Sequence, residues 1–457
     1  MTDTPSRREF LRRAAALGVT GAAAPLALNL AAIGEAAAQT ATDYKALVCV
    51  FLFGGNDSGN TVVPYDTAGH AQYTTLRSTL ATPRANLART VLVPANPLPG
   101  GQQLALAPEL APLLPVFDAA RLGVLLNVGP LVQPTTKSQY TARSVPLPPK
   151  LFSHNDQQSV WQSSTPEGAT SGWGGRIGDL FAAGNGEATF TCVSVSGNAV
   201  YLSGRSAVQY QMSSNGSVAI TGIGPTLFGS AAAATALRTL ITTAGTSNLH
   251  EREHARLVSR SISANTTVTS ALGAAPALTT VFPSTGLGGQ LRTVARMLSA
   301  RGTLGAKRQV FFVSLGGFDL HDDLVALHPG LLGQVAGAMA AFDAALTELG
   351  LQNQVTTFTA SDFGRTLTSN GDGSDHGWGS HHLVMGGAVR GRRLFGTWPV
   401  LANNGPDDVG QGRLLPTTSV DQLGATLASW FGVGGGDLAT VMPQIVNYSN
   451  RDLGLFA

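Results

Sequence analysis

The chain has 457 residues, with 29 Lys and Arg against 27 Asp and Glu, which gives a formal net charge of +2 at pH 7. A nearly neutral balance without a basic run argues against nucleic acid as a partner. Hydrophobic residues make up 43% of the chain and charged residues only 12%, with 55 glycines. The composition therefore indicates a sizeable core whose elements are joined by many tight loops.

The N-terminus carries the pattern of a twin-arginine export signal. The letters SRREFL at positions 6–11 precede a weakly apolar run over 14–33 and three alanines at 36–38, which fit a small-residue cleavage site. Two glycines and a proline interrupt the run, so a membrane helix fits it less well. We expect a signal peptide at residues 1–38, recognition by the twin-arginine translocase, and a periplasmic or secreted product without a stable membrane anchor.

Beyond the signal, apolar runs alternate with helical patterns, which is typical of an α/β fold. Strands are expected at 46–53, 90–94, 123–128, 309–315, 355–359 and 383–385, with a strand pair in 188–202. Helices are expected at 109–120, 173–181, 237–270, 287–301, 331–349 and 419–430. The strand at 309–315, the helix at 331–349 and the strand at 355 form a βαβ unit with parallel strands.

We therefore predict one α/β domain at 39–457, built on a mostly parallel sheet flanked by helices. The region 204–284 is dominated by Ser, Ala, Gly and Thr, and we expect it to be an insertion that caps or flanks the sheet. His250 and His254 are four residues apart on its helix, but charged neighbours favour a solvated face over a metal site.

Three of the strand-like runs end in loops that carry acids. Asp57 follows the run at 46–53, Asp319 and His321 follow the run at 309–315, and Asp362 follows the strand at 355, with His376 in the next loop. Parallel strands end at one edge of a sheet, so these residues are expected to lie together. Carboxylates mixed with imidazoles suit Zn²⁺, Mn²⁺ or Fe better than Ca²⁺. These five residues predict a site for one or two divalent metals, although each acid alone fits a turn or cap.

Further residues near these loops are candidates for catalysis. Ser153 and His154 begin a predicted helix, whose N-terminus favours anions, although a simple N-cap also explains Ser153. Asn60 follows a Gly-Gly turn that allows close approach of backbone to a ligand. Bound water, Ser58 or Ser153 can serve as nucleophile. Arg365 is suited to grip a small anionic ester in a planar fork.

The two cysteines, Cys49 and Cys192, both lie in apolar strand-like runs and in no metal or redox spacing. Two buried thiols explain them most simply. An oxidising compartment also permits a disulfide between them, so the sequence leaves both states open.

Four motifs resemble the DUF1501 family of exported bacterial proteins. They are GGND with NTVVP at 54–64, GFDLH at 317–321, SDFGRT at 361–366 and DHGWG at 375–379, and LPTTSVDQ at 415–422 also fits. That family, whose function is unknown, is grouped with the alkaline phosphatase and sulfatase superfamily. The resemblance implies an alkaline phosphatase-like fold and, in the superfamily's enzymes, one or two metals that support hydrolysis of phosphate or sulfate esters.

The chain departs from the superfamily pattern in two places. Asp362 is followed by Phe363, where the superfamily often has His, and no Cys or Ser lies in the sulfatase motif C/S-x-P-x-R. We therefore carry two hypotheses forward. One is an exported metal-dependent hydrolase of phosphate or sulfate esters, and the other is a non-catalytic exported binding or partner protein that retains the fold.

Overall fold

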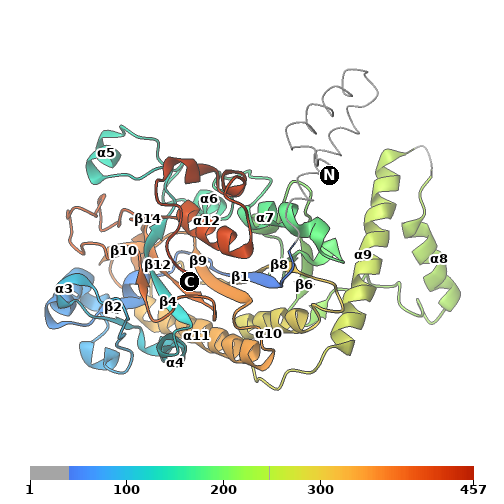
Figure 1. Cartoon of the computed structure of the whole chain (residues 1–457), viewed down its shortest axis with the longest axis horizontal. Coiled ribbons are helices and arrows are strands. Elements are labelled where there is room, and N and C mark those ends of the chain that lie inside the picture. The colour runs from blue at the N-terminus through green and yellow to red at the C-terminus, as the bar shows by residue number, and fades with distance from the viewer. Residues whose placement is uncertain (1–40, 246–247) are drawn as a thin grey trace, which may run out of the picture.

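A computed structural model describes residues 41–245 and 248–457, so the expected signal peptide lies outside the described residues. Within them, ten strands form one mixed, mostly parallel sheet between two layers of helices (Figure 1). The strand order is β13, β4, β12, β9, β1, β8, β5, β6 and β7, and β14 pairs with β4. The strands are β1 Lys45–Leu52, β4 Leu122–Gly129, β5 Cys192–Ser194, β6 Tyr210–Ser213, β7 Gly216–Ser217, β8 Arg308–Leu315, β9 Val355–Ser361, β12 Ser380–Met385, β13 Leu394–Phe395 and β14 Thr418–Ser419.

The central strand β1 explains why its sequence reads as a continuous apolar run. It pairs in parallel with β8 on one side and β9 on the other. Val48 and Val50 point into one hydrophobic core, and Cys49 and Phe51 point into the core on the opposite face. A parallel strand that is covered on both faces has no solvent-facing row of side chains, so its residues are apolar throughout. The carboxyl ends of β1, β8 and β9 consequently meet at one edge of the sheet.

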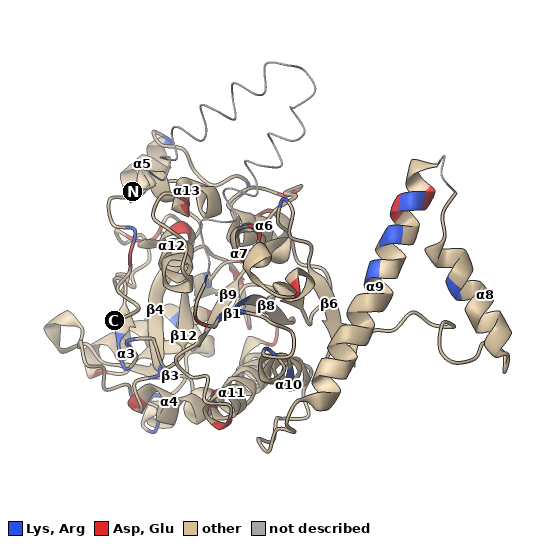
Figure 2. Cartoon of the chain, turned by 45° about the vertical axis from the view of Figure 1, so that its right-hand side comes forward, with Lys and Arg blue, Asp and Glu red and all other residues tan. Residues whose placement is uncertain are grey.

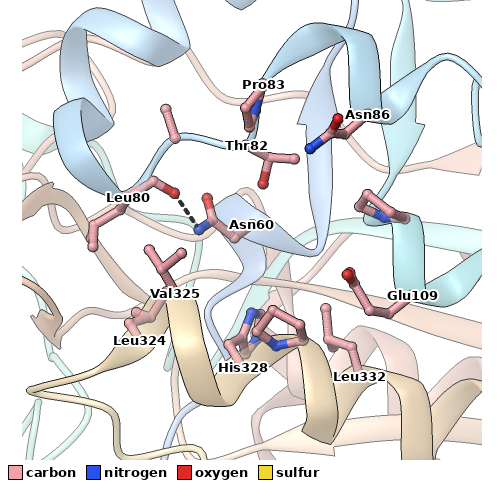
Figure 3. A pocket seen from close by; sticks show the side chains of 13 residues that line it. Asn60, Leu80, Thr82, Pro83, Asn86, Glu109, Leu324, Val325, His328 and Leu332 are labelled. Atoms are coloured by element: carbon pink, nitrogen blue, oxygen red, sulfur yellow. Dashed lines mark hydrogen bonds between the residues drawn. The ribbon is translucent and has the colours of Figure 1, made fainter.

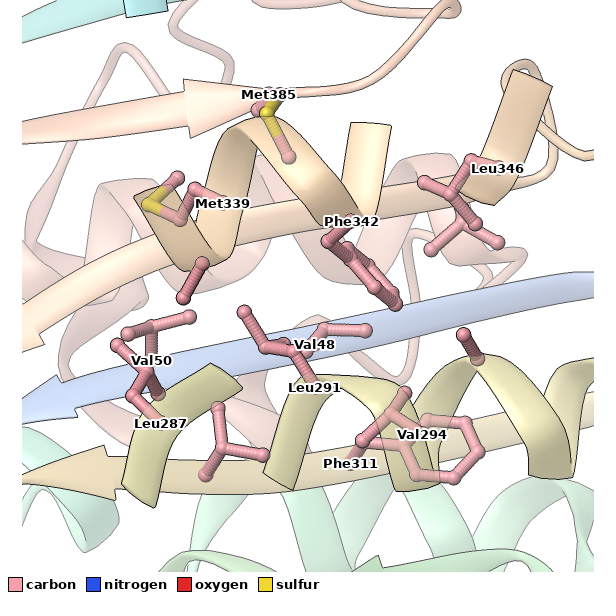
Figure 4. Close-up of a cluster of buried hydrophobic side chains, with 14 of the residues drawn as sticks. Val48, Val50, Leu287, Leu291, Val294, Phe311, Met339, Phe342, Leu346 and Met385 are labelled. Atoms are coloured by element: carbon pink, nitrogen blue, oxygen red, sulfur yellow. The ribbon is translucent and has the colours of Figure 1, made fainter. Parts of the chain in front are cut away.

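Helices cover both faces. On one face, Leu291 of α10 and Phe342 of α11 pack around Val48 of β1 (Figure 4). The other face is covered by α6, α7, α12 and α13. The helices are α3 Thr67–Arg77, α4 Leu114–Asp118, α5 Lys137–Ala142, α6 His154–Ser163, α7 Trp173–Phe181, α8 Ala231–Thr242, α9 Leu249–Ala274, α10 Gly286–Ser299, α11 Leu324–Glu348, α12 Val420–Phe431 and α13 Leu438–Val441.

Helix α11 is long and apolar enough to cross a membrane by length and composition. It is a core helix here, because Val335, Met339 and Phe342 are buried against the sheet. The helix begins at Leu324 and not at residue 331, where the sequence predicted its start.

The α/β architecture with a mostly parallel sheet is confirmed, with three changes in detail. Strand β12 runs antiparallel to both β9 and β4. Strands β8 and β9 belong to one parallel βαβ unit, but β1 lies between them. The predicted strand at 90–94 is reduced to a single bridge between Val91 and Ala105.

Two further predictions were wrong because short-range geometry prevailed over the apolar pattern. The predicted helix at 109–120 is a 3₁₀ segment over Pro108–Leu113 followed by the short α4, since Pro112 lacks the N–H that an α-helix interior needs. The predicted strand pair at 188–202 contains only β5, between 3₁₀ turns at Ala188–Phe190 and Val200–Leu202.

The Ser/Ala/Gly/Thr-rich region forms an arm beside the sheet. Helices α8 and α9 replace the single predicted helical segment at 237–270 and stand out from the body (Figure 2). The C-terminal half of α9 is anchored by buried Val268 and Ala271, whereas Leu249 and Leu257 in its N-terminal half are exposed. His250 and His254 are exposed on this half, as the charged pattern indicated.

Candidate metal centre

Three parts of the chain that are far apart in sequence meet beyond the carboxyl ends of the central strands: the loop after β8, the start of α6, and the loop after β9 with the hairpin that follows it. The loop after β8 supplies Asp319 and His321, and the loop after β9 supplies Asp362. The chain then forms a hairpin of β10 (Arg365–Ser369) and β11 (Ser374–His376), which pairs Arg365 with His376. Helix α6 begins at His154 and brings this residue to the same place. Apart from these segments, β2 (Val62–Pro64) and β3 (Leu104–Leu106) form a separate two-stranded antiparallel sheet.

Three imidazoles and one carboxylate converge here, and we call His154, His321, His376 and Asp319 the histidine cluster. The Nε2 atom of His376 lies 3.0 Å from Nε2 of His154 and 2.9 Å from Nε2 of His321. Asp319 reaches all three, with its oxygens 3.3 Å from Nε2 of His154, 3.1 Å from Nε2 of His321 and 3.2 Å from Nε2 of His376.

The opposite nitrogens of two of these rings face oxygen acceptors. Nδ1 of His154 lies 2.7 Å from a carboxylate oxygen of Asp362, and Nδ1 of His376 lies 2.7 Å from the carbonyl oxygen of Phe152. A carbonyl oxygen has no proton to give, so Nδ1 of His376 must be the donor. The Asp362 carboxylate oxygen favours the same tautomer on His154, with Nδ1–H as the donor.

The third ring obeys the same rule, because Nδ1 of His321 lies 3.2 Å from a carboxylate oxygen of Asp375. In their neutral forms all three imidazoles therefore direct Nε2 lone pairs toward one another and toward the Asp319 carboxylate. No proton is left to hold these acceptors together, so the arrangement needs a cation between them, either a metal ion or added protons.

The surroundings shift the pKa values of the cluster in different directions. The hydrogen bond to Asp362 raises the pKa of His154, whereas burial lowers the pKa of His376. For Asp319, burial favours the neutral acid, but the hydrogen bond and charge of Arg365 outweigh it and lower the pKa. At neutral pH the carboxylate is thus charged and His376 is neutral, as ligands to a metal must be.

Asp362 is the most deeply buried acid of the site, with no exposed surface. One of its oxygens accepts from the backbone N–H of Gly54 at 3.2 Å and from the Gln158 amide at 2.8 Å, in addition to His154. The other oxygen has no hydrogen-bond partner among the described residues. Asp362 therefore orients an imidazole from behind and retains one buried acceptor.

Phe363 occupies the space beneath the imidazoles. Its ring centre lies 4.9 Å from that of His154 and 4.7 Å from that of His376. The ring also fills the room above Gly55, where a Cβ would come within 2.5 Å of it. At the position where a second histidine was expected from the superfamily, the chain thus places an apolar wall.

Arg365 connects the neighbouring loops through its hydrogen bonds. Its side chain is fully buried, and its Nη1 atom lies 2.7 Å from Asp319 and 3.2 Å from the Gly54 carbonyl oxygen. Its Nη2 atom donates to the carbonyl oxygen of Ser374. With these donors engaged, the structure places Arg365 behind Asp319 and not in open space.

Asp57 lies outside the cluster. Its side chain is 2% exposed and pairs with the equally buried Arg77 of α3. Arg77 also donates to the carbonyl oxygen of Thr366 at 2.7 Å. One group of potential metal ligands lies within residues 41–245 and 248–457: His154, Asp319 and His376. Each offers a ligand atom, and these atoms all lie within 4.8 Å of one another.

Two other predicted site residues, Asn60 and Ser153, also point elsewhere. Asn60 donates to the Leu80 carbonyl oxygen at 2.8 Å and lines a separate cavity of about 160 Å³ that also contains His328 (Figure 3). The Ser153 hydroxyl donates to Asp156 at 3.0 Å and makes no capping bond. Ser58 is buried, in the 3₁₀ turn that follows Asp57.

Comparison with known families shows to which family the chain belongs. The family described as "Protein of unknown function (DUF1501)" matches residues 44–441. The chain belongs to the DUF1501 family. No curated protein matches this DUF1501 chain.

Solved structures similar to the DUF1501 chain include two that superimpose loosely over most of its length. The crystal structure of Ps i-CgsB in complex with k-i-k-neocarrahexaose has a TM-score of 0.34 and 10% identity, covering 90% of this chain and 78% of that one. The PsFucS1 sulfatase from Pseudoalteromonas sp. has a TM-score of 0.35 and 8% identity, covering 88% and 71%. The chemistry must therefore be argued from the chain's own residues.

Of the ten residues predicted for the site, the DUF1501 chain brings six together. They are His154, Asp319, His321, Asp362, Arg365 and His376. Sequence reasoning missed Asp375, which directly precedes His376, and Gln158, one turn after His154 on α6. It also missed the Phe152 carbonyl oxygen, for which no sequence signal exists, because any residue carries a carbonyl.

The donors of the histidine cluster fit a divalent metal. Three imidazoles and one carboxylate match the preferences of Zn²⁺, Mn²⁺ and Fe. Each imidazole has an oxygen partner on its far nitrogen, which is the outer support that metal-binding histidines usually have. Within the described residues, the DUF1501 chain thus carries a candidate metal centre, with Phe363 packed against two of its imidazoles.

Proposed function

We propose that this chain is an exported, metal-dependent hydrolase of phosphate or sulfate esters, with one divalent metal held by His154, His321, His376 and Asp319. The observation that carries the proposal is the convergence of three imidazole Nε2 atoms on the Asp319 carboxylate, while the far nitrogens of the rings face oxygen atoms. Export through the twin-arginine translocase to the periplasm or beyond is part of the same proposal and rests on the SRREFL leader.

A divalent metal at such a centre supplies Lewis-acid polarisation of an ester oxygen and lowers the pKa of bound water. The chain's own residues prepare the place. Asp362 and the Phe152 carbonyl fix the tautomers of His154 and His376, so that both present Nε2 lone pairs. Arg365 holds Asp319 from behind, which keeps the carboxylate ionised and aimed at the imidazoles.

We favour water as the nucleophile over a serine. The Ser153 hydroxyl is engaged with Asp156, and Ser58 is buried in the 3₁₀ turn that follows Asp57. We also propose that Asp57 stabilises the fold and does not bind the metal, and that Arg365 positions Asp319 and does not contact substrate.

The test begins with metal analysis of protein purified without chelator, and continues with a screen of aryl phosphate, phosphodiester and aryl sulfate substrates. We expect about one metal per chain and turnover of at least one ester class. His376→Ala should lose both, whereas His250→Ala, on the exposed half of α9, should keep both.

Two other outcomes have definite meanings. Stoichiometric metal without turnover in the ester screen would favour the non-catalytic binding protein that retains the fold. Protein without bound metal, even after incubation with Zn²⁺, Mn²⁺ or Fe²⁺, would overturn the proposal.

A further inference from the structure

The proposed site needs a cation that meets the anionic substrate, and Arg365 does not offer one. Its side chain is fully buried, and its contacts with Asp319, Gly54 and Ser374 use both terminal nitrogens. A bidentate grip on a phosphate or sulfate requires two parallel N–H donors that face open space. Another residue must supply them.

Arg413 has the required geometry. Its Nε atom donates to the backbone carbonyl oxygen of His376 at 3.0 Å, and its guanidinium lies 4.4 Å from the ring centre of Phe152. The two terminal nitrogens have no hydrogen-bond or ion-pair partner within the described parts of the chain, and the side chain is partly exposed. Arg413 is therefore anchored at one edge while its fork remains available.

Arg413 contacts His376 and Phe152, and these two residues are hydrogen-bonded to each other at the histidine cluster. The Phe152 carbonyl oxygen accepts a hydrogen bond from Nδ1 of His376, and the Phe152 ring packs against the Arg413 guanidinium. Phe152 adopts φ of 72°, a conformation that a bulky side chain seldom takes. Such sparsely populated backbone conformations cluster at functional sites.

The loop that presents Arg413 is also specified by sequence. Gln411 and Gly412 both have positive φ, and Arg413 N–H closes the turn onto Gly410. A Cβ on Gly412 would lie 2.8 Å from the backbone nitrogen of Leu367 in β10. Only glycine fits there, so the turn is locked against the strand that leads to the cluster.

From this geometry we infer that Arg413 forms an anion-binding subsite beside the histidine cluster and receives the tetrahedral oxyanion, phosphate or sulfate, of the ester. This inference rests on the proposed function for its role in turnover, but the binding of a free oxyanion can be measured without any turnover. The guanidinium lies over the Phe152 ring, a cation–π contact that arginine makes more often than lysine.

The test is calorimetric titration of the metal-loaded full chain with inorganic phosphate and with inorganic sulfate at constant ionic strength. Arg413→Ala should weaken the binding of at least one oxyanion by about 10- to 100-fold, the range for loss of charge-assisted hydrogen bonds. Arg413→Lys should restore only part of the affinity. Arg89→Ala, at an exposed arginine of an outer loop, is the matched control and should bind as the wild type does.

Equal oxyanion affinity in wild type and Arg413→Ala would overturn the inference, as would a wild type that binds neither ion. Circular dichroism of Arg413→Ala checks that lost affinity is not lost structure, and a folded Arg413→Lys variant with intermediate affinity supports the inference independently. Should the chain turn over no ester and yet bind an oxyanion through Arg413, the subsite stands and only the proposed hydrolysis fails. If turnover is found, Arg413→Ala should raise KM for the ester.

Discussion

Two acid-bearing loops at the same sheet edge place their carboxylates in different surroundings. The loop after β1 carries Asp57, which turns to Arg77 and is buried with it. The loop after β8 carries Asp319, which is 44% exposed and meets three imidazoles as well as Arg365. Both acids follow apolar parallel strands, so position alone does not distinguish them. Each acid has an arginine partner, so the exposure of the carboxylate and its imidazole neighbours decide whether it only stabilises the fold or can also bind a cation.

The difference teaches that burial and charge balance separate structural from functional acids. A buried carboxylate with one arginine forms a closed pair, whose charges have no reason to recruit a metal. Asp319 is also paired with an arginine, Arg365, but its carboxylate is half-exposed and faces three imidazoles, so it stays open to a further cation. Substitutions that remove one partner should therefore cost stability in the first loop and metal affinity in the second.

The largest effect is expected for Asp57→Ala, which leaves the buried Arg77 guanidinium without its counter-charge. Loss of one partner of a buried pair costs about 3–5 kcal/mol of unfolding free energy. Urea denaturation measures it, and metal content should be unchanged. The double variant Asp57→Leu with Arg77→Met should recover much of the stability. Loss of bound metal in folded Asp57→Ala would place Asp57 back among the ligands.

His376→Ala should come next and act in the opposite way. Nε2 of His376 lies within 3.2 Å of Asp319, His154 and His321, so its removal opens the centre of the cluster. Metal affinity should fall by more than the roughly 10- to 100-fold that loss of an outer partner costs. Competition titration with a chromogenic chelator measures the affinity. Wild-type affinity in this variant would remove the metal centre from consideration.

A smaller loss is expected for Asp362→Asn, which keeps the shape behind His154 but removes the negative charge. We predict roughly a 10- to 100-fold decrease in metal affinity, the usual cost at an outer partner. The same competition titration applies. An unchanged affinity would show that the charge of Asp362 does not reach the cluster through His154.

The smallest effect is expected for Asp375→Asn. Asp375 lies 3.2 Å from His321 and its side chain is 49% exposed, so water screens its charge. We predict a loss of less than about tenfold in metal affinity, below the range for a buried outer partner. A loss larger than that of Asp362→Asn would reverse the ranking by burial.

The sequence predicted the sheet well because its central strands are covered on both faces. Continuous apolar runs identify β1, β8 and β9, and the edge rule for parallel strands then brings Asp319, His321 and Asp362 near one another. Elements without a long apolar run, such as the bridge at Val91, depend on tertiary contacts that no short window reveals.

The details of the site were beyond the same reasoning. Nothing in the letters around Arg77 marks it as the partner of an acid 20 residues earlier. Phe152 acts through its carbonyl oxygen and its φ of 72°, which are properties of the backbone. Arg413 enters from a loop more than 30 residues after His376, and only the folded chain places its guanidinium on the Phe152 ring.

Both cysteines, Cys49 in β1 and Cys192 in β5, are buried free thiols. Burial raises the pKa of each thiol, so neither is reactive while the sheet is intact. The fold consequently needs no oxidant to be completed and can form in a reducing compartment before any transport. The same pair provides a built-in reporter, since a thiol-specific reagent should label the chain only when the sheet opens.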